Sequence, residues 1–188
     1  MPRTKTTFSP AEYAVIGLLR SHPSHGYDLQ RLLTGRRGLG LVCPVEPAMV
    51  YAILKSLSGL ELIDGEWDGS SYPPKAIYSV TDSGDAEFQR WLSRPVERMR
   101  EVRLDLMVKL YFLMEGHDAD PSRARELIED QLDICDAYAR EIEGELESVE
   151  PDSFDAVALG SKLSAAVLTR AWLADCLNHL KTTGTEAL

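Results

Sequence analysis

Two short strand patterns that directly follow three helical patterns are the feature that most restricts the fold of this 188-residue chain. The strand patterns are ELIDGEW (61–67) and KAIYSV (75–80), and the breaker-rich segment DGSSYPP separates them. The helical patterns cover about residues 10–20, 24–33 and 47–60. This order predicts a winged helix-turn-helix with a two-stranded wing.

Capping signals mark where several of these helices begin. Ser9-Pro10-Ala11-Glu12 is a capping box with proline at the first helical position. Thr81 is expected to cap a fourth helix that runs to about Leu92. The third helix has an apolar face with i, i+3, i+4, i+7 spacing, and its opposite face carries Ala48, Tyr51, Ala52, Lys55 and Ser56.

The second half of the chain predicts long helices. One covers about 97–116, a second is capped by Asp120-Pro121 and reaches about Val149, and a third follows EPDS. The last two carry apolar residues in coiled-coil steps, and a second copy of the chain would bury the excess apolar surface. The predicted dimerisation residues are Ile128, Leu132, Ile142, Leu163, Leu173 and Leu177. We therefore expect a mainly α chain with a head at 1–94 and a C-terminal long-helix dimerisation domain at 95–188.

Charge is distributed unevenly between these halves. The net charge is −10, yet residues 1–94 hold ten basic and ten acidic side chains, so the whole excess lies in 95–188. Residues 1–60 hold seven basic side chains and three acidic ones. A mildly basic head on an acidic tail is compatible with DNA binding when the tail faces away from the duplex.

Other functional classes find little support. No apolar run is long enough for a membrane span, and the N-terminus lacks a signal-peptide pattern. Cys43, Cys135 and Cys176 lack C-x-x-C spacing, which indicates reduced thiols in a cytoplasmic protein. No catalytic or nucleotide-binding motif is present, and His22 and His25 are an unconvincing H-x-x-H metal pair. We expect no enzyme activity, no cofactor, no metal and no membrane partner.

Four segments together resemble the PadR family of bacterial transcriptional regulators. They are YAVIGLLRSHPSHGYDLQRLL, VYAILKSLSGLELI, PPKAIYSVTDSG and MVKLYFL, and the resemblance covers nearly the whole chain. It implies a winged helix-turn-helix head and, as in one branch of the family, a long helical dimerisation region. Two positions depart from the family pattern: Glu61 stands where glycine is usual, and Ala52 where arginine or lysine is usual.

The resemblance implies that the third helix and the wing contact a double-stranded DNA operator. The prolines of the wing would stiffen it and present Lys75 toward phosphate or the minor groove. Since the third helix offers no Arg, Asn or Gln for bidentate base pairing, DNA shape and half-site spacing would carry much of the specificity. The candidate DNA-binding residues are Tyr51, Lys55, Lys75, Ser56, Ala48, Arg36 and Arg37.

Two features of the tail have alternative interpretations. Trp172 and Tyr138 either line a site for a small aromatic or drug-like effector, which the resemblance implies, or belong to the core. Arg170 either snorkels at the edge of an apolar seam or pairs with a carboxylate of the long helix or of a partner chain.

The sequence as a whole predicts a cytoplasmic homodimeric regulator, most simply a repressor, that binds a pseudo-palindromic operator and responds to an effector. The competing hypothesis is a helical protein-interaction module whose winged head does not bind DNA. Ala52, Glu61 and the seven acidic against three basic side chains of residues 61–94 keep this alternative open.

Overall fold

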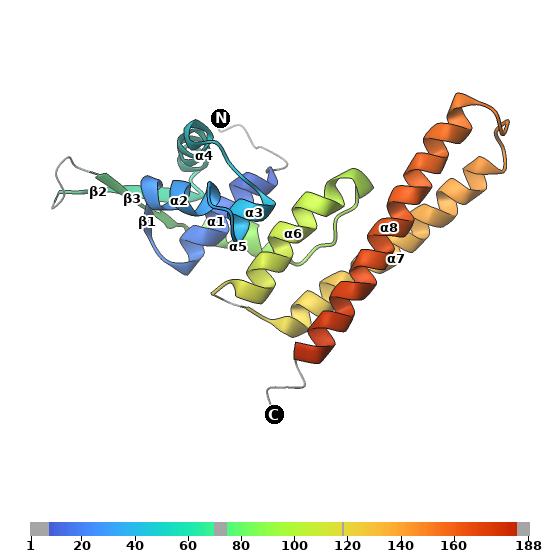
Figure 1. Cartoon of the computed structure of the whole chain (residues 1–188). Helices are drawn as coiled ribbons and strands as arrows, with labels where there is room; N and C mark the ends of the chain where they lie inside the picture. Colours follow the sequence, from blue (N-terminus) through green and yellow to red (C-terminus); the bar gives the residue numbers. More distant parts are fainter. Residues whose placement is uncertain (1–7, 70–74, 118, 184–188) are drawn as a thin grey trace. The chain divides into compact units, whose positions relative to one another are not determined.

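The computed structural model describes residues 8–69, 75–117 and 119–183, which group into two compact units (Figure 1). The first unit contains residues 1–94 and 104–119, and the second contains 95–103 and 120–188. The expected boundary at residue 94 differs from this grouping. Residues 104–119, which include the later part of the helix Met99–Glu115, belong to the first unit. The functional assignment of the two domains stays a prediction.

The helices of the first unit follow the predicted order. They are α1 (Pro10–Ser21), α2 (Gly26–Leu33), a short α3 (Leu39–Val42), α4 (Pro47–Gly59) and α5 (Asp82–Leu92). The capping box is confirmed: the Ser9 Oγ accepts from the Glu12 amide at 3.3 Å, and Glu12 Oε2 accepts from the Ser9 amide at 2.8 Å. Thr81 likewise caps α5, through an Oγ1 that accepts from the Gly84 amide at 3.1 Å.

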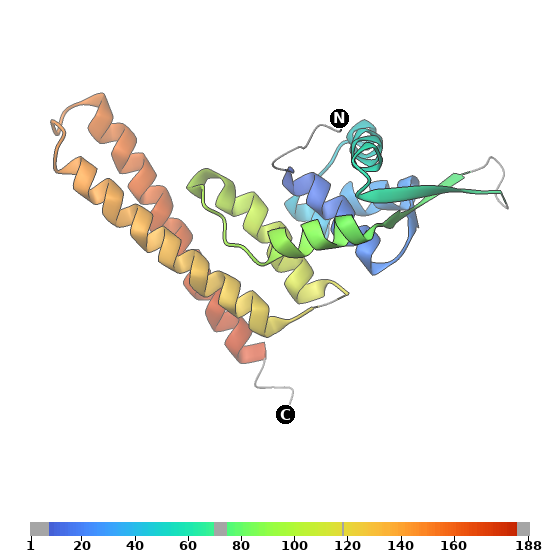
Figure 2. The ribbon, with the colours of Figure 1, turned by 180° about the vertical axis from the view of Figure 1, so that it is seen from behind.

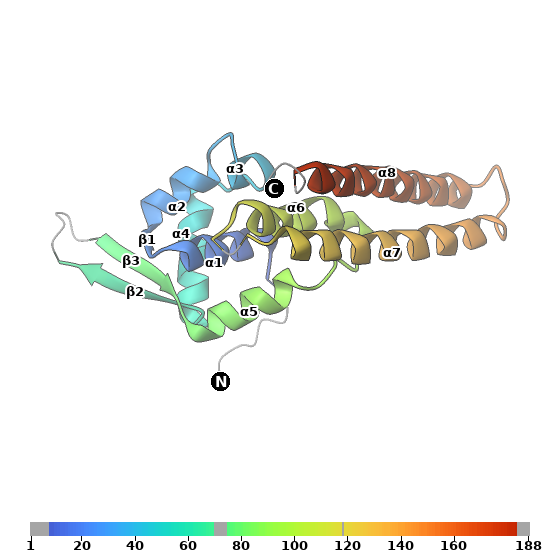
Figure 3. The same ribbon diagram turned by 90° about the horizontal axis from the view of Figure 1, so that it is seen from below.

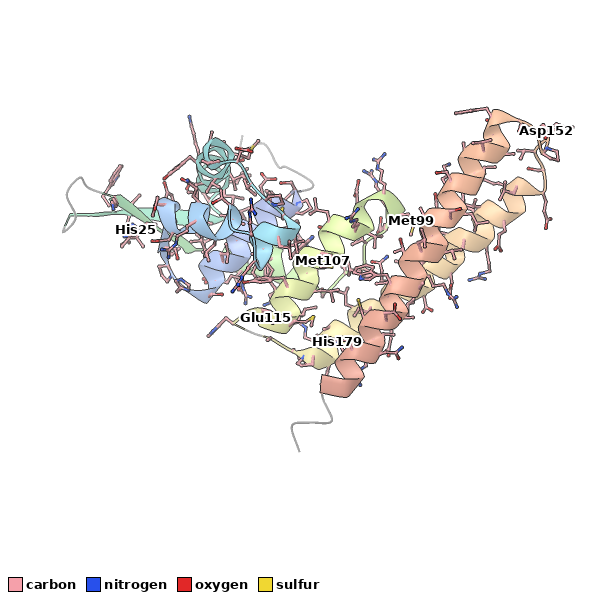
Figure 4. The ribbon with its side chains drawn as sticks, viewed as in Figure 1. His25, Met99, Met107, Glu115, Asp152 and His179 are labelled. Carbon is pink, nitrogen blue, oxygen red and sulfur yellow. The ribbon has the colours of Figure 1, made fainter. Side chains whose placement is uncertain are left out.

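The wing is part of a three-stranded antiparallel sheet, where a two-stranded one was predicted. Strand β3 (Lys75–Val80) lies between β2 (Ile63–Asp68) and a two-residue β1 (Ser24–His25). Ser24 and His25 were expected to begin the second helix; instead they pair with Tyr78 and Ile77. His25, labelled in Figure 4, also places its Nδ1 3.1 Å from the carbonyl oxygen of Ala76. Figure 3 shows β2 and β3 running side by side away from the helices of this unit.

An aromatic cluster joins α1, α5 and the later part of α6 (Met99–Glu115). The rings of Tyr13 and Trp91 are stacked at 4.2 Å between centroids, and Trp91 Nε1 donates to Asp105 at 3.1 Å. Lys109, only 2% exposed, donates to the backbone carbonyl of Arg94 at 2.5 Å and lies over the Trp91 ring. Burial lowers the pKa of Lys109, and burial raises the pKa of Tyr13 to about 12. This cluster fixes α6 to the winged head.

The second unit is built on two long helices, α7 (Pro121–Leu146) and α8 (Phe154–Thr183), which lie side by side in every view (Figures 1 and 2). Asp120 caps α7 as predicted, accepting from the amides of Ser122 and Arg123. Gln131 is fully buried and makes both hydrogen bonds of a peptide group with Val96: it accepts from the Val96 amide at 2.7 Å and donates to the Val96 carbonyl at 2.9 Å. The chain before α6 is thereby held against α7.

The end of α4 contains the only non-glycine residue of the described chain with a positive φ. Glu61 has a φ of 59°, and it directly follows the C-cap residue, Leu60. The amide of Leu62 donates to the carbonyl of Leu57, and the amide of Glu61 to that of Ser58, which together form a Schellman motif. Glycine suits this position best because a Cβ is strained in the left-handed region. This geometry explains why glycine is the residue expected here.

Replacing Glu61 with glycine should raise the free energy of unfolding by about 1 kcal/mol, because the left-handed strain is removed. Urea denaturation followed by circular dichroism measures the change. Glu61→Ala is the matched control: it removes the same carboxylate but keeps a Cβ, and its stability should stay within about 0.5 kcal/mol of the wild type. Equal stabilisation by both substitutions would contradict the backbone explanation.

Candidate nucleic-acid interface

Helix α4 presents one face to solvent because its other face is buried in the winged head. Val50, Ile53, Leu54 and Leu57 are each at most 5% exposed. The exposed residues form what we call the recognition face, defined as Ala48, Met49, Tyr51, Ala52, Lys55 and Ser56. Four of the predicted DNA-binding residues, Ala48, Tyr51, Lys55 and Ser56, therefore lie together on one solvent-facing surface.

Tyr51 is held in place by the start of α2. Its ring lies so close to Gly26 that a Cβ on that glycine would be 2.9 Å from Cε1 of the ring and 3.2 Å from Cδ1 of Leu54. The side chain nevertheless stays 50% exposed. A phenol packed at its base and open to solvent at its tip can donate a hydrogen bond to a phosphate oxygen without first being ordered.

The remaining predicted basic residues lie outside α4. Arg36 and Arg37 are exposed in the bend between α2 and α3, and Lys75 is exposed at the start of β3. Pro73 and Pro74, to which the sequence assigned the stiffness of the wing, lie outside the described residues. The structure thus places all seven candidate residues in the first unit and at its surface, and a role in DNA contact stays a prediction for each.

Sequence reasoning missed two exposed aromatic residues in the same unit. Tyr27, the second residue of α2, is 61% exposed, and Trp67 on β2 is 75% exposed. In the sequence Tyr27 was interpreted only as a residue of the second helix, and Trp67 only as a strand residue. Their exposure depends on tertiary packing, so no local pattern could have revealed it.

The predicted effector residues, Trp172 and Tyr138, are half-buried on α8 and α7. Neither lines the pocket of about 310 Å³ near the turn between these helices, where Figure 4 labels Asp152. Arg170, by contrast, has a resolved interaction: its Nε lies 2.6 Å from Asp136 Oδ1 on α7. Arg170 therefore pairs with a carboxylate of the long helix within the single chain, where the sequence analysis had favoured a snorkelling side chain, and an exposed ion pair of this kind stabilises only slightly.

The six predicted dimerisation residues differ in burial. Ile128, Ile142 and Leu173 are at most 3% exposed within one chain, and Leu132, Leu163 and Leu177 are half-buried. The stripe identified in the sequence thus coincides with the seam between α7 and α8, so a second chain is not required to cover it. Whether these residues also contribute to a dimer stays a prediction.

The described residues contain neither a candidate metal site nor a candidate membrane span. Within the part of the chain that the structure describes, no three His, Cys, Asp or Glu side chains form a group that could hold a metal ion. Among the same residues, no helix combines the length and apolar character that crossing a membrane requires.

The helix order, the wing and the exposed face of α4 define a winged helix-turn-helix of the DNA-binding class. The model of the family described as "Transcriptional regulator PadR-like family" matches residues 15–90. The negative transcriptional regulator PadR of Bacillus subtilis (strain 168) is 31% identical over 166 residues, covering 85% of this chain and 86% of that protein. The chain therefore belongs to the PadR-like family of transcriptional regulators, and it is a DNA-binding regulator rather than an enzyme.

Solved structures of Bacillus subtilis PadR are also similar to this chain. The complex with operator DNA shares 27% identity and a TM-score of 0.46, over 92% of this chain and 99% of the other. The complex with p-coumaric acid shares 26% identity and a TM-score of 0.39, over 93% and 99%. The family assignment itself rests on the sequence match.

The contact between Gly26 and Tyr51 can be tested by a double-mutant cycle. Gly26→Ala should lower the free energy of unfolding by about 1–3 kcal/mol, because the new methyl group overlaps the Tyr51 ring. In a Tyr51→Ala background the same substitution should cost at least about 1 kcal/mol less. An equal cost in both backgrounds would show that the ring does not restrict position 26.

Proposed function

We propose that this chain is a homodimeric repressor that binds a pseudo-palindromic operator through two winged heads and is released by a small aromatic or drug-like effector. The main support for the proposal is the recognition face, which is exposed to solvent. The chain that presents this face is 31% identical to a negative transcriptional regulator. Two heads at a fixed separation would contact successive major grooves on one side of the duplex. Because both half-sites must be bound at once, a modest change in head separation would weaken binding strongly.

Direct base recognition by α4 is expected to be limited. The recognition face carries a single charged residue, Lys55, the phenol of Tyr51, and small or apolar side chains elsewhere. Ala48 and Ala52 can contact a thymine methyl group, but they cannot hydrogen-bond a base edge. Phosphate contacts from Tyr51, Lys55 and the Arg36–Arg37 bend would position the head, and DNA shape and half-site spacing would supply specificity.

For the dimer contact we propose a surface that the sequence did not single out. Helix α8 carries exposed apolar side chains on the side away from its seam with α7: Phe154, Val157 and Leu168 are 82%, 68% and 72% exposed. With Ser161, Ser164 and Ala171 they step 3-4-3-4-3 along one face, which we call the outer stripe of α8. Such a stripe, free of charged residues, is suited to close packing against its copy.

The outward face of α7 favours the same assignment. It is acidic, with the exposed residues Glu126, Glu129, Asp130, Asp133, Glu141 and Glu143. Two copies meeting through this face would bring like charges together, which opposes association. A second copy is therefore expected to pack on α8.

The effector is proposed by family likeness. Bacillus subtilis PadR has been solved with p-coumaric acid, so phenolic acids are the first compounds to test against this chain. Trp172 and Tyr138 remain the aromatic residues proposed to respond. The protein-interaction alternative, which Ala52, Glu61 and the acidic wing favour, predicts no DNA binding at any salt concentration.

Lys55→Gln should weaken binding to operator and mixed-sequence DNA alike, because a phosphate contact does not read sequence. For a dimer it should also lower the slope of log affinity against log salt by about 2, because fewer counterions are released. Fluorescence anisotropy of labelled duplexes across a salt series measures both. Lys162→Gln, an equal charge change on α8, should alter neither. If the Lys55→Gln variant keeps the wild-type salt slope, Lys55 does not contact DNA phosphate.

Leu168→Asp should convert the dimer to a folded monomer, because it places two charges in the proposed contact. Leu173 is fully buried, so Leu173→Asp should instead destabilise each chain, by about 3–5 kcal/mol. Sedimentation velocity and thermal unfolding separate the two effects. A monomeric wild type at micromolar concentration, or a Leu168→Asp variant that stays dimeric, would contradict the proposed contact.

A further inference from the structure

The two faces of the wing differ in chemistry. In the register of β2 and β3, Asp64 pairs with Ser79 and Glu66 with Ile77, whereas Gly65 pairs with Tyr78 and Trp67 with Ala76. Residues directly opposite each other in an antiparallel pair share a face, and successive residues alternate between faces. One face therefore carries carboxylates, and the other carries aromatic and small side chains.

The carboxylate face is poorly suited to DNA. Asp64 and Glu66 are both exposed, so they would stand against the phosphates of any duplex that approached from that side. The position of Lys75 belongs to this same face, because its partner in the register, Asp68, lies two residues beyond Glu66. The lysine that the sequence singled out thus shares its face with acidic residues.

The opposite face continues the side of β2 that packs into the winged head. Ile63, at the base of this face, is 1% exposed, and β2 packs against α4. Further out, the ring of Tyr78 covers Gly65 so closely that a Cβ on this glycine would lie 3.1 Å from Cε1 of the ring. Trp67 follows, opposite the small side chain of Ala76, and its indole remains 75% exposed.

Trp67 differs in this respect from the other two tryptophans. Trp91 is 9% exposed, stacked on Tyr13 and hydrogen-bonded to Asp105, and Trp172 is half-buried. An exposed tryptophan leaves a large apolar ring surface unburied, and its N–H donor lacks the partner that such donors usually have when buried. Because Asp64 and Glu66 lie on the other face of the wing, the charge distribution does not oppose DNA as the partner of Trp67.

We propose that the wing approaches DNA with its aromatic face and that Trp67 packs against the deoxyribose and minor-groove edge of the duplex. This inference rests on the proposed DNA-binding function and names a contact within it. An indole can cover sugar atoms with its ring and donate its N–H to the acceptors of the minor-groove floor. It carries no charge, so the contact adds affinity without releasing counterions.

The indole itself reports the contact. A short mixed-sequence duplex, titrated at low salt into the full chain, should change the tryptophan emission of the wild type. The change should be absent or strongly reduced in Trp67→Phe, which retains Trp91 and Trp172. Anisotropy of the labelled duplex measures binding in the same samples. If the duplex binds and the two proteins show the same change in emission, Trp67 does not touch DNA and the inference fails, while the DNA-binding function stands.

Affinity gives a second, independent test. Trp67→Ala should weaken duplex binding by about tenfold and leave the salt slope unchanged. Glu66→Ala, one residue away on the other face, should not weaken binding. Equal affinity of Trp67→Ala and wild type, or a loss in Glu66→Ala that matches the loss in Trp67→Ala, would overturn the assignment of faces. Failure of the wild type to bind any duplex would instead overturn the proposed function.

Discussion

The burial of one face of α4 is the constraint on which the winged head depends. Val50, Ile53, Leu54 and Leu57 each contribute about 1.5–3 kcal/mol when removed from water, so the helix cannot rotate about its axis without a large loss. Because that face is fixed in the core, the opposite face must point to solvent, and it carries Ala48, Tyr51, Lys55 and Ser56. The Schellman motif then ends α4 with Glu61 in a left-handed conformation, from which the chain turns into β2. The buried face of α4 thus sets the orientation of the recognition face, and the helix end sets where the wing begins.

The distribution of charge then determines which of the exposed surfaces are suited to contact DNA or a second copy. Acidic residues cover one face of the wing and the outward face of α7, and neither is suited to a polyanion or to its own copy. The aromatic face of the wing and the outer stripe of α8 lack such residues. The acidic excess of the chain is thus expected to restrict which surfaces contact DNA and which contact the second copy, and it does not conflict with DNA binding.

The sequence predicted the elements that local signals determine. The capping residues Ser9, Thr81 and Asp120 and the period of α4 identified helix starts and faces correctly, because these effects act within a few residues. Strand β1 was missed because a two-residue strand shows no sequence period, and its strand character comes from pairing with β3.

The apolar steps of α7 and α8 were recognised, but periodicity cannot tell whether a stripe faces a neighbour in the same chain or in another. Leu173 proved to be covered within the chain, whereas Leu168 was overlooked. The exposure of Trp67 and the contact of Tyr51 with Gly26 likewise arise only from tertiary packing.

Selection of bound duplexes from a random-sequence library, followed by sequencing, tests whether two winged heads recognise one operator together. We expect enrichment of an inverted repeat whose half-sites are separated by about one helical turn, because two recognition faces related by two-fold symmetry must meet successive major grooves. We also expect sequence preferences at uncontacted base steps between the half-sites, where DNA shape is read. Enrichment of a single unrepeated motif would contradict the dimeric arrangement, and the absence of any enrichment over the starting library would contradict specific DNA recognition altogether.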